Sequence, residues 1–256
     1  MKPVVRLTQV SQVIDLSPNL RRIVLTGDEL VGFPEDQQGA HVKVLLPDAG
    51  ETMPNMKVMG EGAAVKRSYT IRYYDKAANE IGLDFVVNRH QGPATQWACQ
   101  AKVGDYLGIA GPGPRKLTNF DADTYLLVGD LTSVNAVNAY AQSIPETAKG
   151  YVIVEVPTRE DILPIECADN VSVQWVIVNE QTENQREALL NAVSALPVVP
   201  CNTEVFLGLE ARQIRTIKNY LLEEREIERC CVHATGYWKK GVDADRFSAD
   251  KTVNPL

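Results

Sequence analysis

The chain has 256 residues, 45% of them apolar and 23% charged, and a formal net charge of −7. This profile is typical of a soluble globular protein with one large domain or two of ordinary size, and the acidic balance argues against nucleic acid as a partner. The N-terminus lacks an apolar core long enough for a signal peptide, and no apolar run approaches the length of a membrane span. We therefore expect a cytoplasmic protein without a membrane partner.

The cysteines and histidines form no familiar catalytic or metal-binding pattern. The number of cysteines is odd and no pair has CxxC spacing, so we expect no disulfide framework, zinc site or iron–sulfur cluster, and no protein-bound metal. None of the three histidines lies in a hydrolase or zinc motif. The absence of a nucleophile favours chemistry supplied by a cofactor. The cysteines are Cys99, Cys167, Cys201, Cys230 and Cys231.

The first half of the chain is rich in strand signals. Six short strands and one helix before residue 112 predict a small antiparallel barrel. The irregular segment 47–65 is longer than most connections, which is typical of a functional lid or a disordered loop. The predicted strands are 4–14, 20–27, 41–46, 68–74, 81–87 and 106–110, and the predicted helix is 92–100.

The second half alternates strands with helices, which predicts a parallel sheet covered on both faces. The sequence GPGPRK marks a break, so we expect a barrel domain over 1–115 and an α/β domain over 121–256. Ligands bind beyond the carboxyl ends of parallel strands, where a cleft against the barrel can form. The predicted strands are 124–128, 150–156, 171–178, 203–207 and 228–234, and the predicted helices are 133–142, 184–193 and 211–224.

The segment KRSYTIR, residues 66–72, is the first candidate for ligand binding. Side chains alternate along a strand, so Arg67 and Tyr69 share one face, and Ser68 and Arg72 point the other way. A charge followed by a flat ring suits a ligand with a phosphate and an aromatic plane, which Thr70 can also meet through its backbone. The alternative is an amphipathic strand with charged ends.

The segment NRHQGPATQWACQ, residues 88–100, predicts a helix whose start faces an anion. Gly92 allows close backbone approach, and the first free N–H groups belong to Ala94 and Thr95, where the helix dipole favours a phosphate. Arg67 can add a charge-assisted contact to the same phosphate. The alternatives are an ordinary capped helix and, for His90, a structural role.

Two segments of the second half are candidates for the ligand side of the sheet. VGDLTSVNAV, residues 128–137, places Asp130 and Thr132 at a strand end, although Thr132 or Ser133 can instead simply cap the helix. HATGYWKKGVDADR, residues 233–246, predicts a ligand-facing turn with Tyr237 and Trp238. The alternative there is a terminal strand that packs these rings between the domains, with solvated lysines.

Taken together, these pieces resemble the siderophore-interacting protein family, flavin-dependent ferric-siderophore reductases of the ferredoxin–NADP reductase superfamily. The resemblance extends over nearly the whole chain and lies in five motifs of matching order and spacing. They are RSYTIR (67–72), LDFVVNRHQGPATQWA (83–98), GDYLGIAGPGP (104–114), LLVGDLTSVNAV (126–137) and GYWKKG (236–241).

The resemblance implies a six-stranded antiparallel Greek-key barrel that binds FAD, followed by a parallel-sheet α/β domain of the NAD(P)-binding kind. Tyr69 is then expected against the isoalloxazine ring, and the helix start near the pyrophosphate. The residues expected to bind the cofactor are Arg67, Ser68, Tyr69, Thr70, Arg72, Asp84, His90, Gly92, Ala94, Thr95, Asp130, Thr132, Ser133, Tyr237 and Trp238.

The family's activity implies that NADPH or NADH reduces the flavin, which then reduces Fe(III) held in a siderophore and releases Fe(II). A ferredoxin is the alternative donor. General flavin or ferredoxin–NADP-type reductases, and non-catalytic siderophore-binding proteins, are the alternative functions. An anionic siderophore calls for local basic residues despite the overall acidity. The candidates are Lys57, Lys66, Arg115, Lys116, Lys239, Lys240 and Arg246.

Overall fold

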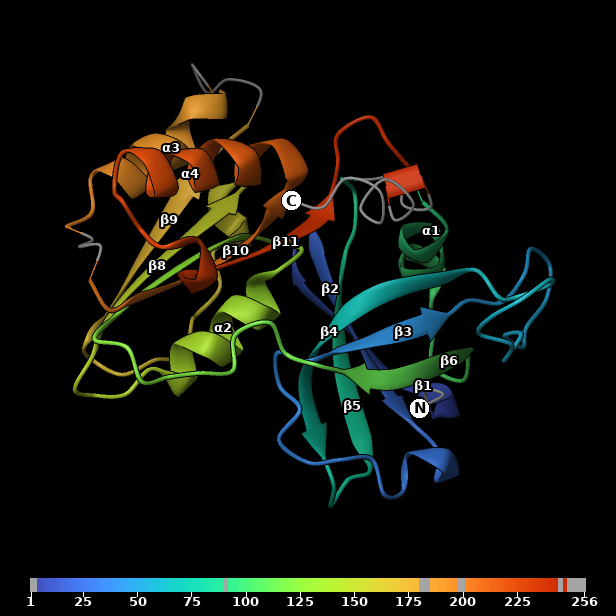
Figure 1. The fold of residues 1–256 in the computed structure, drawn as a ribbon. Coiled ribbons are helices and arrows are strands. Elements are labelled where there is room, and N and C mark those ends of the chain that lie inside the picture. The colour runs from blue at the N-terminus through green and yellow to red at the C-terminus, as the bar shows by residue number, and fades with distance from the viewer. Residues whose placement is uncertain (1–3, 90–91, 180–184, 198–200, 244–245, 248–256) are drawn as a thin grey trace. The chain divides into compact units, whose positions relative to one another are not determined.

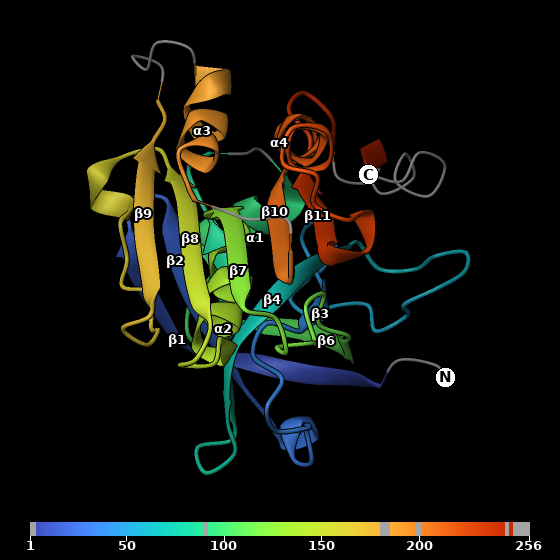
Figure 2. The same cartoon turned by 60° about the vertical axis from the view of Figure 1, so that its left-hand side comes forward.

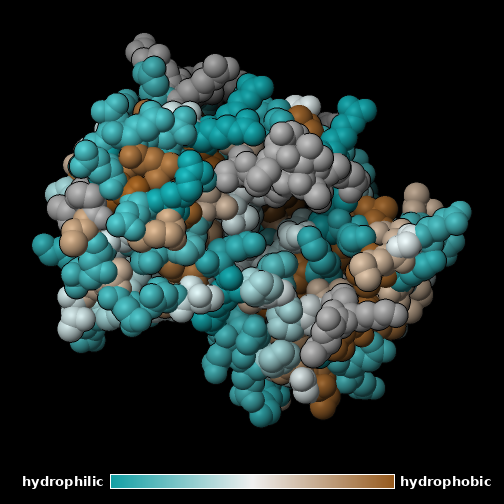
Figure 3. Space-filling view, viewed as in Figure 1, coloured by the Kyte–Doolittle hydropathy of each residue, from teal (hydrophilic) through white to brown (hydrophobic). Residues whose placement is uncertain are grey.

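The computed structural model describes residues 4–89, 92–179, 185–197, 201–243 and 246–247 (Figure 1). By its internal contacts the chain divides into two compact units, Met1–Arg115 and Lys116–Leu256. Hydrophilic side chains predominate over much of the face shown in Figure 3. Within the described ranges, the helices are too short or too polar to cross a membrane.

The first unit contains a closed antiparallel barrel with the strand order β1-β2-β5-β4-β3-β6. Because β6 pairs with β3 while β3, β4 and β5 are consecutive neighbours, the arrangement is a Greek key, as predicted. The strands are β1 (Val5–Ser17), β2 (Leu20–Thr26), β3 (His41–Leu45), β4 (Lys66–Asp75), β5 (Glu80–Val86) and β6 (Tyr106–Gly113), with a 3-10 turn η1 (Asp28–Leu30).

The barrel closes because its strands carry alternating apolar residues whose inward side chains fill one core. Ile23, Leu83 and Phe85 are completely buried in it. Helix α1 (Pro93–Gln100) packs onto the same core through Ala94 and Ala98. The antiparallel barrel therefore supplies a rigid support for both β4 and the helix.

The long segment between β3 and β4 is held by backbone hydrogen bonds and packing. Leu46 N–H donates to the Val65 carbonyl (3.0 Å), and Ala64 N–H donates to the Lys57 carbonyl (2.8 Å). Ala64 also packs in a small apolar cluster with Leu45. The segment that was predicted as a lid or a disordered loop is thus a connection between β3 and β4 that hydrogen bonds hold in place.

The second unit contains a five-stranded parallel sheet in the order β11-β10-β7-β8-β9, and Figure 2 shows the strands side by side in this order. The parallel sheet confirms the predicted fold class. The elements are β7 (Thr124–Asp130), α2 (Val134–Ser143), β8 (Lys149–Val156), η2 (Arg159–Asp161), β9 (Val171–Ile177), α3 (Gln185–Ser194), β10 (Thr203–Glu210), α4 (Ala211–Glu223), η3 (Arg229–Cys231) and β11 (Val232–Trp238).

Helices cover both faces of this sheet (Figure 1). Val205 and Leu207 of β10 pack in the core that α3 and α4 share with the sheet. Phe206, which lies between them, meets the Tyr140 ring of α2 edge-on at 4.9 Å. Because neighbouring side chains of a strand point to opposite faces, α2 covers the face opposite α3 and α4.

The last strand differs most from its prediction. It was expected over 228–234, but Arg229–Cys231 forms the 3-10 turn η3 and the strand runs from Val232 to Trp238. Only Val232 and Gly236 of this strand are buried, so its apolar pattern is weak. The shift places Tyr237 and Trp238 inside the strand rather than in a turn after it.

Candidate functional site

Tyr69, in β4, lies against the aromatic core of the barrel. Its ring centroid is 4.0 Å from that of Phe85, and Phe85 lies 5.8 Å from Trp97 of α1. Burial raises the pKa of Tyr69 above its usual range, and the positive charge of Arg67 opposes this rise only in part. The phenol therefore stays protonated at neutral pH and keeps its O–H as a hydrogen-bond donor.

The neighbours of Tyr69 on β4 differ in exposure. Arg67 is half-buried, and its Nη1 donates to the Lys66 carbonyl at 2.8 Å. Thr70 is buried. Ser68 is exposed, and its hydroxyl accepts a hydrogen bond from the Lys43 ammonium. Arg67 and Thr70 are thus positioned by the barrel, whereas Ser68 lies at its surface.

Strict alternation does not hold along the whole of this strand. Thr70 and Ile71 are both buried although they are adjacent. The pairing of β4 with β5 also changes register between Ile71 and Tyr73, where the half-buried Arg72 lies. Such irregularities re-aim side chains. The direction of Arg72 therefore does not follow from counting residues after Tyr69.

The start of α1 is open. Gly92 is the N-cap residue and makes no side-chain capping bond, and Pro93 occupies the first turn. The φ of Gly92 is −157°, which any residue can adopt, and among the described residues a side chain added there would meet nothing within 4 Å. The N–H groups of Ala94 and Thr95 thus follow a glycine that leaves space for an anion. His90 lies outside the described residues.

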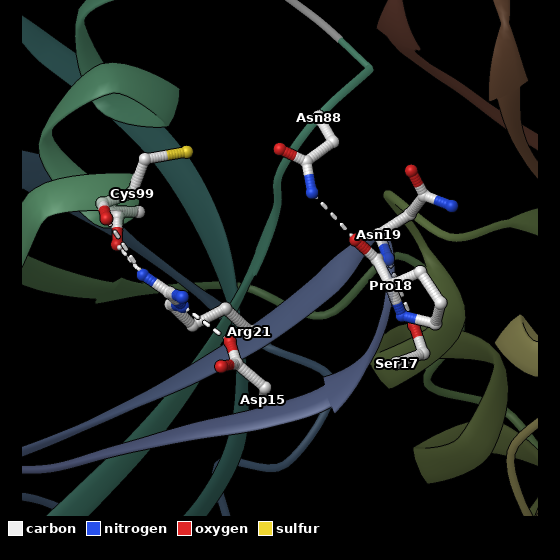
Figure 4. A network of polar contacts seen from close by, with 8 residues as sticks. Asp15, Ser17, Pro18, Asn19, Arg21, Asn88 and Cys99 are labelled. Atoms are coloured by element: carbon white, nitrogen blue, oxygen red, sulfur yellow. Dashed lines mark hydrogen bonds and ion pairs between the residues drawn. The ribbon is translucent and has the colours of Figure 1, made fainter.

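Arg21 fixes the other end of α1 (Figure 4). It donates to the carbonyls of Ala98 (3.0 Å) and Cys99 (2.9 Å) in the last turn, and to the Asp15 carboxylate (2.6 Å). A cation at this end satisfies terminal carbonyls and complements the helix dipole. A hollow of about 410 Å³ adjoins this network, and its lining residues are not among the predicted site residues.

Asp84, predicted to bind the cofactor, has a structural partner. Both of its oxygens accept hydrogen bonds from Arg22 on the neighbouring strand β2, at 2.7 and 2.9 Å. The Asp84 side chain is only 2% exposed, whereas that of Arg22 is 20% exposed. This bidentate pair joins β2 to β5.

Replacing Asp84 with asparagine should separate the structural role from a cofactor role. The change removes the charge of a mostly buried pair and should lower the free energy of unfolding by about 1–2 kcal/mol. Urea unfolding measures this loss, and FAD affinity should be unchanged. The control is Glu35→Gln, which alters the exposed ion pair with Lys76 and should have little effect. Weakened FAD binding in a folded Asp84→Asn protein would instead assign Asp84 to the cofactor.

Asp130 brings together three other predicted residues of the second unit. Its Oδ1 accepts from the N–H (2.8 Å) and the hydroxyl of Thr132, and its Oδ2 accepts from the indole N–H of Trp238 (2.8 Å). Its own N–H donates to the Ser133 Oγ at 3.1 Å. Burial raises the pKa of Asp130, although the hydrogen bonds from Thr132, Trp238 and Ser133 oppose the rise. The cluster joins the carboxyl ends of β7 and β11.

The same cluster engages the residue at the start of helix α2. Ser133 is its N-cap residue but makes no side-chain capping bond. The simple capping role considered for Ser133 is therefore not realised, because its hydroxyl serves the turn after β7. Tyr237 is half-buried beside Trp238 on β11.

The predicted basic residues fall into two groups, one in each unit. In the first unit, Lys57 is exposed, the Lys66 ammonium donates to the Val58 carbonyl at 2.7 Å, and Arg115 donates to the Asp36 carbonyl. These three lie on or beside segments that connect the strands. In the second unit, Lys116, Lys240 and Arg246 are exposed, and Lys239 is half-buried.

Three residues that organise these sites are not among the predicted site residues. Phe85 supports Tyr69 and Arg22 holds Asp84, as described above. Glu210, at the end of β10, accepts from two N–H groups in the first turn of α4 and from the Lys240 N–H (3.1 Å). An acidic residue just before a helix is a capping signal, so only Glu210 had a local signature.

An antiparallel barrel followed by this parallel sheet is the fold of ferredoxin reductases. The ferredoxin reductase in carbazole 1,9a-dioxygenase matches with a TM-score of 0.68 and 15% identity, over 93% of this chain and 70% of that one. The chain belongs to the siderophore-interacting protein family. Residues 9–116 match the model of the siderophore-interacting FAD-binding domain, and residues 122–241 match that of the siderophore-interacting protein.

Two relatives match most of the chain, one by sequence and one by structure. Ferric vibriobactin reductase ViuB of Vibrio cholerae is 33% identical over 249 residues, which are 93% of this chain and 90% of the relative. The siderophore-interacting protein SipS from Aeromonas hydrophila has a TM-score of 0.84 and 30% identity, with 98% of each chain covered. The resemblance inferred from the sequence motifs is confirmed.

Proposed function

We propose that this protein is a flavin-dependent reductase of ferric siderophores, with FAD as its cofactor and NADH or NADPH as its electron donor. The observation that carries the proposal is the match of both units to the domains of one family, together with a relative named ferric vibriobactin reductase that aligns over 93% of the chain. The expected substrate is an anionic Fe(III) complex.

The barrel unit suits FAD in three respects. The start of α1 has no side-chain cap among the described residues, and they leave space at Gly92, which suits a pyrophosphate. Arg67 is a cation held near Tyr69 on the same strand, which suits a second phosphate contact. Tyr69 offers a ring held by Phe85 and a neutral hydroxyl, which suits an aromatic plane with polar edges. We infer that these residues hold the cofactor, with Thr70 beside them.

When bound, FAD would supply the redox chemistry, since a flavin can accept two electrons from a nicotinamide and pass them on singly. The chain's own residues would bind and orient the cofactor and the substrate. Arg67 and the start of α1 would neutralise phosphate charge, and Tyr69 would contact the aromatic ring system and offer its hydroxyl as a hydrogen-bond donor. The basic residues of either unit attract the anionic substrate. Once iron is reduced, its lower charge weakens its attraction to anionic oxygen ligands, so the siderophore releases it.

The test is an anaerobic assay with FAD-loaded protein, NADH or NADPH, a ferric catecholate or hydroxamate siderophore, and a chromophoric Fe(II) trap. The expected result is formation of the trapped Fe(II) complex at a rate that rises with protein concentration. Oxidation of the nicotinamide without faster iron trapping would identify a general flavin reductase. Siderophore binding without electron transfer would identify a carrier, and protein that cannot be reconstituted with FAD would refute the proposal.

A further inference from the structure

The turn η3 gathers two thiols and a carboxylate just before β11. The Sγ atoms of Cys230 and Cys231 are 3.8 Å apart, and the Cys230 Sγ lies 3.5 Å from the Glu228 Oε2. All three donor atoms lie within 4.8 Å of one another. Glu228 and Cys230 are exposed, and Cys231 is half-buried. A solvent ion therefore has access to the group.

These distances fit a tetrahedral cation. Around zinc with Zn–S bonds of about 2.3 Å and a Zn–O bond of about 2.1 Å, two sulfur atoms are about 3.8 Å apart and a sulfur and an oxygen about 3.6 Å apart. The observed Sγ–Sγ and Sγ–Oε2 distances are 3.8 and 3.5 Å. Two of the three distances between the donor atoms therefore match those of a tetrahedral zinc site.

Charges of both signs lie around the turn, and its carboxylates favour a cation. Glu204 of β10 lies close enough to act on Cys231, and its carboxylate is paired with His233 at 2.6 Å. A bound divalent cation would neutralise part of this negative charge. The cationic Arg229 of the same turn acts on Lys218 of α4, whose pKa it lowers after burial.

The group is separate from the candidate cofactor residues of its own unit. It lies at the amino end of β11, whereas the Asp130–Trp238 bond lies at the carboxyl end of that strand. Six residue steps of a strand span about 20 Å. A substitution in η3 can therefore be tested for its effect on metal binding without disturbing Trp238.

We propose that Glu228, Cys230 and Cys231 form a binding site for a thiophilic divalent cation of the zinc type, with the fourth position open. Two thiolates select a soft or borderline ion over Mg²⁺ or Ca²⁺, which prefer all-oxygen ligands. One exposed carboxylate completes a three-ligand set like those of zinc sites that keep an open position. The search for CxxC spacing misses this site because the two cysteines are adjacent.

Cobalt(II) is the probe, because thiolate ligation gives it intense charge-transfer absorption that oxygen or nitrogen ligation does not. The full chain, kept reduced with a phosphine, is titrated with Co²⁺, and Zn²⁺ is then added. We expect a thiolate-to-cobalt band that saturates at one equivalent and is abolished by Zn²⁺. Saturation without a thiolate band, or a band that Zn²⁺ does not remove, would overturn the proposal.

Matched variants assign the band to the turn. Cys230→Ser and Cys231→Ser should each remove most of the band, and Glu228→Gln should keep it but weaken Co²⁺ binding by about tenfold or more. Cys99→Ser removes an exposed cysteine of the other unit and should bind like the unaltered protein. Because Glu228 and Cys230 are exposed, their variants should fold, which circular dichroism checks. A band lost in Cys99→Ser, or retained in both turn cysteine variants, contradicts the site.

Discussion

Phe85→Ala is expected to lower the free energy of unfolding of the barrel unit by about 3–5 kcal/mol. The Phe85 side chain is completely buried and lies between the rings of Tyr69 and Trp97. Its removal takes apolar atoms out of the core and leaves a cavity beneath both rings. Urea unfolding followed by far-ultraviolet circular dichroism measures the loss.

A second readout links this core residue to the cofactor. Without Phe85 the Tyr69 ring loses its support, so FAD should also be retained less well at temperatures where the variant is folded. Phe85→Leu refills much of the space and should cost less than Phe85→Ala in both measurements. The exposed Val103 is the control, because its change to alanine should alter stability by no more than about 0.5 kcal/mol. Equal stability of Phe85→Ala and Val103→Ala would contradict the assigned packing.

Arg67→Ala is expected to weaken FAD binding by about 10- to 150-fold, which corresponds to about 1.5–3 kcal/mol for a lost charge-assisted contact. The half-buried Arg67 precedes Tyr69 by two residues on β4. Quenching of flavin fluorescence during titration of apoprotein measures the affinity.

Two controls separate a phosphate contact from a general effect of charge. Arg67→Lys keeps the charge and should recover part of the affinity, although the planar fork of donors is lost. Lys76→Ala removes an exposed cation paired with Glu35 on the same unit and should leave FAD binding unchanged. If a folded Arg67→Ala protein binds FAD as tightly as the unaltered chain, Arg67 does not contact the cofactor.

The local pattern of apolar and polar residues was sufficient to predict the order of strands and helices along the chain. Alternating apolar residues marked the barrel strands, and strand–helix alternation marked the parallel sheet, because both signals come from neighbouring residues. The pattern failed where a residue's conformation depends on a distant partner. The adjacent buried residues Thr70 and Ile71 reflect the changed register of β4 against β5, which only the paired strands determine.

The candidate sites show the same limit. The uncapped helix start at Gly92 was predictable, since glycine and proline are adjacent in the sequence. The pairing of Asp84 was not, because its partner Arg22 is 62 residues away. The bond between Asp130 and Trp238 joins residues 108 positions apart. Spacing along the chain identifies which residues are available, and the fold determines which of them meet.

The barrel and the parallel sheet differ in whether they have edge strands. This difference affects how the protein aggregates when it is partly unfolded. The barrel closes on itself, so its strands pair on both sides. The parallel sheet has two edge strands, β11 and β9. The sequence of β9, VSVQWVI, contains no charged residue, no histidine and no proline. An uncharged edge strand rich in β-branched and aromatic residues is a template for pairing with another chain. Aggregation should therefore begin at β9, and a lysine at an outward position there should delay it.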